Sequence, residues 1–174
     1  AVENLEIGGR NLILDSKGEF GYAIPITTTE PLNVGAKYTL SFDVIGNPNG
    51  IIFLNNSIVT TYDPSGTGWR RRSVTFTFIK NDYFGYEIFP HIYDASSVKN
   101  VKLEKGNKAT DWTPAPEDVQ SEIDDAKQEA LSAASDAQST ADSLKNFTDT
   151  AFRDGIIDRS ESIAIEKYKN SLNE

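Results

Sequence analysis

The chain has no cysteine and no methionine, and His91 is its single histidine. The lack of cysteine excludes a disulfide scaffold, a cysteine nucleophile and a thiolate metal site, and one histidine has no partner for a multi-histidine site. No stretch approaches the roughly 18 apolar residues of a membrane span, so we expect no membrane insertion. The chain has no signal-like start. It begins at Ala1 and lacks a methionine for a natural start, so we expect a piece of a longer protein.

Charge and aromatic content divide the chain into two regions. Residues 1–115 contain 11 basic, 12 acidic and 15 aromatic residues, whereas residues 116–174 contain 6 basic, 14 acidic and 3 aromatic residues. The net charge of −9 argues against a nucleic-acid partner. Two close prolines, Pro114 and Pro116, cannot continue a strand ladder or a helix interior, so residues 113–116 are predicted to be a stiff linker.

The whole chain has 38% hydrophobic residues, enough for one packed core. Residues 1–112 have the composition of β structure. Apolar and polar residues alternate over 38–44 and 74–78, which predicts strands with one buried face. Eight short strands without helical patterns between them predict a mainly β fold, an antiparallel β-sandwich of the jelly-roll class. These predicted strands cover residues 11–15, 22–28, 37–45, 50–54, 57–62, 69–79, 84–93 and 98–104.

Residues 117–152 follow a seven-residue rhythm. Apolar or small residues recur at alternating steps of four and three from Val119 to Ala151, which favours a C-terminal α-helical coiled-coil stalk. The middle of this seam is alanine and threonine, so it buries little area and is expected to be weak. Two alternatives stay open: a helix that folds back on its own chain, and helix-forming disorder.

Residues 153–174 are predicted to form a turn and a second, truncated helix. Gly155 can end the first helix, and Asp158 followed by Glu161 resembles a capping box. The same string is also similar to the back half of a calcium-binding loop. However, Thr150 and Phe152 stand where that loop needs its first acidic ligands, so we favour the capped turn.

The sequence has no motif for catalysis. It contains no phosphate-binding glycine loop and no nucleophile elbow, so no enzyme is expected. Arg70, Arg71 and Arg72 form the single basic cluster, but they lie within a predicted strand and therefore alternate between its faces. Ion pairs or a polar sheet face are a better interpretation of this cluster than an anion site.

Aromatic residues suggest a ligand-binding surface instead. Glu87, Phe89, His91 and Tyr93 share one parity, which puts flat rings and hydrogen-bonding groups on one sheet face. Sugars stack their C–H faces on aromatic rings while polar neighbours bind the hydroxyls. The candidate ligand-binding residues are Trp69, Arg71, Glu87, Phe89, His91 and Tyr93. For Trp69, Trp112 and His91, an ordinary structural role is the alternative.

Several motifs are similar to a known protein class. Residues 9–13, Gly-Arg-Asn-Leu-Ile, and strands 38–44 and 69–77 resemble the carbohydrate-binding-like jelly rolls of phage and prophage tail proteins. Residues 101–118, which include Asp111-Trp112-Thr113-Pro114, resemble the exit of that galactose-binding-like module in minor structural, tail-fibre or baseplate proteins, where coiled-coil helices follow. Residues 152–157 and the helix after them also look like the next helical element of such proteins.

This resemblance implies a non-catalytic tail component for host adsorption, located in the virion tail and extracellular when assembled. Its implied partners are a host cell-surface polysaccharide or glycan, other tail or baseplate proteins, and two further copies in a homotrimer. No cofactor is required, although modules of this type often hold a structural calcium ion. Two alternatives remain: the binding module of a secreted bacterial glycoside hydrolase, and a purely structural tail spacer.

Overall fold

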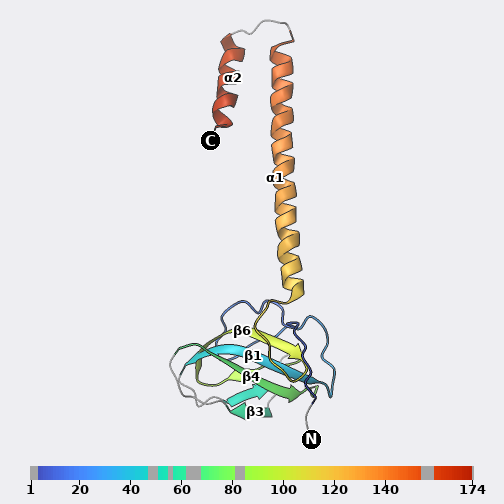
Figure 1. The fold of residues 1–174 in the computed structure, drawn as a ribbon. Helices are drawn as coiled ribbons and strands as arrows, with labels where there is room; N and C mark the ends of the chain where they lie inside the picture. Colours follow the sequence, from blue (N-terminus) through green and yellow to red (C-terminus); the bar gives the residue numbers. More distant parts are fainter. Residues whose placement is uncertain are drawn as a thin grey trace. The chain divides into compact units, whose positions relative to one another are not determined.

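A computed structural model describes residues 4–46, 51–54, 57–61, 68–80, 85–153 and 159–173. In chain order, the elements are β1 (Lys37–Gly46), β2 (Ile51–Leu54), β3 (Ser57–Thr61), β4 (Arg70–Thr77), β5 (His91–Ile92), β6 (Ala95–Lys105), α1 (Pro116–Ala151) and α2 (Arg159–Ser171). The prediction of antiparallel strands followed by two helices is therefore confirmed (Figure 1).

The described strands form two three-stranded antiparallel sheets. One has the order β4-β1-β6 and the other has the order β3-β2-β5. In the first sheet, Leu40 of β1 lies opposite Val74 of β4 on one side and Leu103 of β6 on the other. Because these three residues share a face, they bring their side chains together into one core.

The core confirms the alternation seen in the sequence. Tyr38, Leu40, Phe42 and Val44 of β1 are all buried, and they share a hydrophobic cluster with Ile92 of β5. Residues from both sheets thus contribute to the same core. The prediction of a single buried face is wrong for β1, however, because Thr39 and Ser41 on the opposite face are buried as well. Other parts of the chain therefore cover the polar face of this strand.

The N-terminal segment does not form the two strands predicted at 11–15 and 22–28. It makes single bridges instead: Ile13 with Thr28, Phe20 with Val98, and Ala23 with His91. The segment contains prolines, which lack the N–H that a continuous ladder needs, and Asp15 has a φ of 55°. Through these bridges the segment borders both β6 and β5.

The predicted strand 84–93 is also shorter than expected, because only His91 and Ile92 are in a strand within its described part. Gly85 has a φ of 82°, and Pro90 precedes the strand, so a regular ladder cannot run through this stretch. The capped turn predicted at Gly155 and Asp158 lies outside the described residues.

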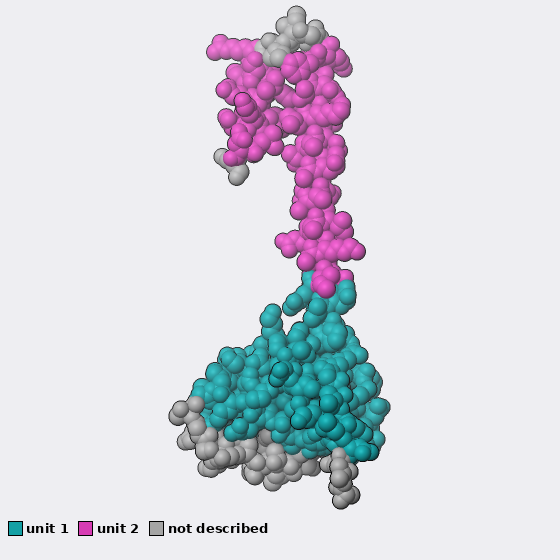
Figure 2. Space-filling view, viewed as in Figure 1, with its two compact units in different colours: residues 1–122 teal, residues 123–174 magenta. Residues whose placement is uncertain are grey.

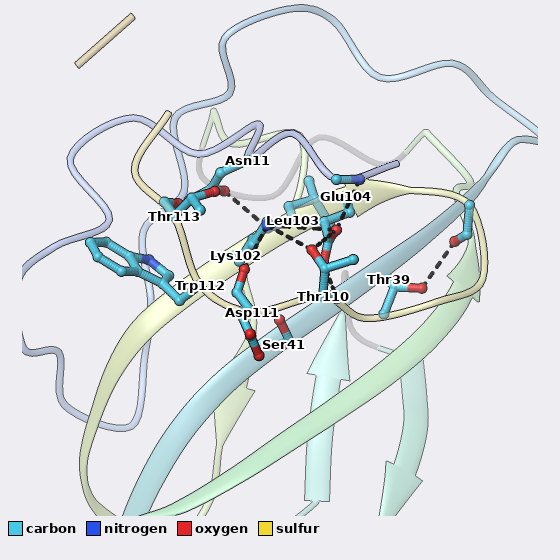
Figure 3. A network of polar contacts seen from close by, with 12 residues as sticks. Asn11, Thr39, Ser41, Lys102, Leu103, Glu104, Thr110, Asp111, Trp112 and Thr113 are labelled. Carbon is cyan, nitrogen blue, oxygen red and sulfur yellow. Dashed lines mark hydrogen bonds and ion pairs between the residues drawn. The ribbon is translucent and has the colours of Figure 1, made fainter. Parts of the chain in front are cut away.

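The outer face of the sheet β4-β1-β6 is covered by residues 106–115, which we call the exit segment (Figure 3). Beneath it, Lys102 and Glu104 of β6 are buried, and their charged groups lie 3.7 Å apart. The Lys102 ammonium donates to Thr110 Oγ1 and to the Asp111 carbonyl, each at 2.8 Å. Glu104 accepts from the Thr110 amide and hydroxyl. The exit segment therefore makes hydrogen bonds to both members of this buried ion pair.

A close backbone contact and an ion pair position the start of the exit segment. Gly106 has a φ of 93°, and a Cβ atom there would lie 2.3 Å from the Glu6 carbonyl, so glycine is required. Next to it, Lys105 forms an ion pair with Glu30 at 2.6 Å. That hydrogen bond lowers the pKa of the Glu30 carboxyl and raises the pKa of the Lys105 ammonium.

The chain separates into two compact units, residues 1–122 and residues 123–174 (Figure 2). We call the first unit the head. It includes the first turns of α1, since Glu117 pairs with Arg10, and Asp118 accepts a 3.0 Å hydrogen bond from the Asp15 amide. Pro116, placed in the linker by the sequence prediction, is the first residue of the helix, where a missing N–H costs nothing.

The second unit contains most of α1 and all of α2. Phe147 of α1 packs against Tyr168 of α2, with ring centroids 5.2 Å apart. Leu144 and Phe147 are half-buried, and Ala151 is buried, whereas residues 123–140 of α1 are exposed. Neither helix, in the part of the chain described, has an apolar stretch of the length that a bilayer requires.

Candidate functional site

Five aromatic side chains meet at β5, and we call them the aromatic cluster: Tyr22, Tyr86, Phe89, His91 and Tyr93. Four come from the stretch that contains β5, and Tyr22 comes from the N-terminal segment. Backbone hydrogen bonds bring the two stretches together, because Ile92 donates to the Tyr22 carbonyl at 2.6 Å and Ile24 donates to the Pro90 carbonyl at 3.0 Å.

The rings of the aromatic cluster follow one another in an unbroken series. Tyr86 stacks on Phe89 at 5.3 Å between centroids, and Phe89 meets His91 edge-on at 4.8 Å. His91 is 6.0 Å from both Tyr22 and Tyr93, and those two tyrosines are 6.3 Å from each other. These distances are within the range of favourable aromatic pairs, so the rings support one another's positions.

The aromatic cluster reaches solvent. Tyr22 is 56% exposed and Tyr93 is 43% exposed, while Tyr86, Phe89 and His91 are half-buried. Ile88 and Ile92, which alternate with these residues, are buried in the core. A large exposed tyrosine presents an apolar ring and a hydroxyl together, a combination suited to a ligand with both C–H faces and hydroxyl groups.

Glu87 has a different environment from its aromatic neighbours. Its Oε2 atom accepts hydrogen bonds from the Thr28 hydroxyl at 3.2 Å and the Leu32 amide at 3.1 Å. The carboxylate therefore holds residues 28–32 against the stretch before β5. Glu87 therefore has a structural role in the head.

Trp69 and Arg71 lie on the other sheet. They share the outer face of β4, since Val74 and Phe78 have the opposite parity and are buried. Trp69 is 39% exposed, and the Lys99 ammonium lies 4.0 Å from the centroid of its ring. This cation–π contact is typical of a tryptophan on a polar surface.

Arg71 is engaged in a network at a β-bulge of β6. Its guanidinium donates to the Asn100 carbonyl at 2.6 Å and to Ser41 Oγ at 2.8 Å, and it pairs with Asp43 at 3.4 Å. Asn100, which has a φ of 51°, donates to the same carboxylate. The arginine thus neutralises Asp43 and holds the bulge in place, which agrees with an ion-pair role for this basic cluster.

A pocket of about 440 Å³ lies between Arg71 and the exit segment. Trp112 lines it, and the indole Nε1 of this half-buried residue donates to the Val101 carbonyl at 3.2 Å. The pocket therefore offers a ring beside charges of both signs, Arg71 and Asp43. Those two charges are already paired with each other, which leaves this pocket less suited to a ligand than the aromatic cluster.

The structure thus divides the six predicted ligand-binding residues between the two sheets. Phe89, His91 and Tyr93 lie together in the aromatic cluster, Glu87 borders it, and Trp69 and Arg71 lie on the outer face of β4. The sequence analysis did not include Tyr22 or Tyr86 among the candidate residues. Tyr22 could not be found from its own segment, because its position depends on pairing with β5.

Within residues 4–46, 51–54, 57–61, 68–80, 85–153 and 159–173, no group of three or more histidine, aspartate or glutamate side chains could hold a metal ion. A structural calcium ion therefore remains a prediction without named ligands.

Comparisons with known proteins give one weak match. No protein-family model matches the chain, and no curated protein matches it. Among solved structures, it is similar to the tripod (BppUct-A-L) from the baseplate of bacteriophage Tuc2009, with 17% identity and a TM-score of 0.39. The similarity covers 64% of this chain and 60% of that one. A TM-score this low does not establish a shared fold, so neither fold nor function follows from it.

Proposed function

We propose that the chain is a non-catalytic phage tail component whose head is a carbohydrate-binding module of the jelly-roll class. The observation that carries the proposal is the aromatic cluster, a solvent-reaching group of rings beside a sheet. Two antiparallel sheets that share one core are compatible with a jelly-roll sandwich. The tail assignment rests on the sequence resemblance of the exit segment, and in a virion the ligand is a glycan of the host surface.

Substituting Tyr22 or Tyr93 by alanine is expected to weaken glycan binding by about tenfold, because each loses a stacking ring worth about 1.4 kcal/mol. Melting temperatures are expected to stay nearly unchanged, since both side chains lie at the surface and neither belongs to the buried core. The measurement is a glycan array on the full chain, followed by calorimetric titration of the strongest binder.

Two further variants make this experiment specific. Ile79→Ala removes an exposed apolar side chain outside the aromatic cluster and is expected to leave binding unchanged. Trp69→Ala removes a ring from the other sheet. If Trp69→Ala abolishes binding while the tyrosine variants bind normally, the ligand occupies the outer face of β4 and the aromatic cluster is not the site. If no glycan binds, the structural-spacer alternative is favoured.

We also propose that α1 assembles the chain as a homotrimer. The seam residue Ile123 is 54% exposed, whereas Val119, at the start of the seam, lines a pocket with Arg10 and Asn11 of the head. From Ile123 to Thr140 the seam residues are exposed and therefore open to further copies. Phe147 already contacts α2, so the C-terminal end of α1 folds back as in the fold-back alternative. The trimer is therefore proposed for the part of the seam that precedes this contact.

Ile123→Asp is expected to weaken self-association by at least about 100-fold, because a trimer would bury three uncompensated carboxylates at one level. Gln128→Asp adds the same charge away from the seam and is the matched control. Sedimentation equilibrium at moderate salt measures both, and association is expected to weaken at low salt because the helices are acidic. A wild-type chain that is monomeric at high micromolar concentration would reject the trimer.

A further inference from the structure

We infer that the aromatic cluster binds an uncharged saccharide chain, an inference that rests on the proposed carbohydrate-binding function. The first argument is charge. The two stretches that carry the cluster, residues 18–28 and 85–95, contain Glu19, Glu87 and Asp94 and no lysine or arginine. A phosphorylated, sulfated or uronic-acid glycan would meet like charges from both stretches.

Three cations of the head are engaged with groups outside the aromatic cluster. Lys99 lies over Trp69, and Arg71 pairs with Asp43, both on the outer face of the other sheet. Lys105 pairs with Glu30. Anionic groups are recognised through charge-assisted hydrogen bonds, chiefly from arginine and lysine, and the cluster's own stretches supply neither.

The polar groups that the aromatic cluster does offer are those suited to hydroxyls. Tyr22 and Tyr93 each carry a phenolic hydroxyl that both donates and accepts, and His91 lies between them with its imidazole. Hydroxyl and imidazole groups can hydrogen-bond to sugar hydroxyls without any charge on the ligand. The ring faces meanwhile favour the C–H faces of a sugar.

The extent of the cluster is the second argument. The ring contacts run from Tyr86 through Phe89 and His91 to Tyr22 and Tyr93, with successive centroids 5.3, 4.8 and 6.0 Å apart. A single aromatic platform would suffice for one terminal sugar. Two exposed rings, Tyr22 and Tyr93, with centroids 6.3 Å apart and half-buried rings beside them, instead match at least two consecutive sugars of a chain.

The test is an array of neutral hexose and N-acetylhexosamine oligosaccharides of two to eight sugars, each beside its sulfated, phosphorylated or uronic counterpart. The full wild-type chain is applied with Tyr22→Ala, Tyr93→Ala and Ile79→Ala. Neutral members are expected to bind, and affinity is expected to rise with chain length. Binding is expected to drop about tenfold in the tyrosine variants and to change less than about twofold between 50 and 500 mM NaCl, because no ion pair is formed.

Each other outcome has a distinct meaning. Binding to charged members only, with strong salt dependence, would overturn this inference and leave the carbohydrate-binding function standing. Tyrosine-independent binding to neutral members would overturn the assignment to the aromatic cluster. Binding that is equal for one sugar and for longer chains would overturn the inference of a chain ligand. If no member binds, the proposed function fails and this inference fails with it.

Discussion

Lys102→Met is expected to lower the free energy of unfolding of the head by about 3–5 kcal/mol, because it leaves one charge of a buried pair without its partner. Lys102 and Glu104 are both fully buried under the exit segment. With the ammonium removed, the Glu104 carboxylate keeps its hydrogen bonds from Thr110 but loses the nearby cation. The Thr110 hydroxyl and the Asp111 carbonyl lose a donor at the same time.

Urea denaturation followed by tryptophan fluorescence measures this loss. The same substitution at Lys105 is the matched control, since that lysine pairs with Glu30 at an exposed site and its removal is expected to have a much smaller effect. The double variant Lys102→Met/Glu104→Gln is expected to recover part of the loss, because neither charge is then buried alone. Equal stability of Lys102→Met and Lys105→Met would contradict a role for the buried pair.

The sequence predicted the parts of the fold that depend on local periodicity. In β1, Tyr38, Leu40, Phe42 and Val44 alternate with polar residues, and all four are buried as expected. The helical rhythm after Pro116 likewise predicted a long helix, and α1 spans Pro116–Ala151. In both cases the side chains on one face of a single element recur at a fixed spacing. The pattern is therefore visible in the sequence even when the element that packs against this face is unknown.

The sequence was less informative where partners are distant along the chain. Asn11 and Lys102 look like ordinary surface residues, yet both are buried because other segments cover them. Tyr22 joins the aromatic cluster only through pairing of its segment with β5, and Tyr86 joins it because the stretch before β5 is not a regular strand. Parity arguments could therefore group Phe89, His91 and Tyr93 but could not complete the site.

Asn11→Ala is expected to destabilise the head by about 3 kcal/mol, because buried donors and acceptors would lose their partners. The Asn11 amide nitrogen donates to the Thr113 carbonyl and to Ser16 Oγ, both at 2.9 Å, and to the Val101 carbonyl at 3.3 Å. Its oxygen accepts from the amides of Ile13 at 3.1 Å and Leu103 at 3.2 Å. One side chain thus joins the N-terminal segment, the edge of β6 and the exit segment just before α1.

Asn107→Ala is the control for this prediction, because Asn107 also bridges two segments, through Glu6 and Asn4, but its hydrogen bonds are exposed. It is expected to cost less than about 1 kcal/mol, since water replaces the lost partners. Native-state hydrogen exchange adds a local measurement: in Asn11→Ala, the Ile13 and Leu103 amides are expected to exchange faster. The bridge would be contradicted if these amides kept their protection, or if the two alanine variants were equally stable. Because one buried asparagine makes hydrogen bonds to three segments, it fixes where the chain leaves the sheet. Its loss should therefore loosen the exit segment before the core.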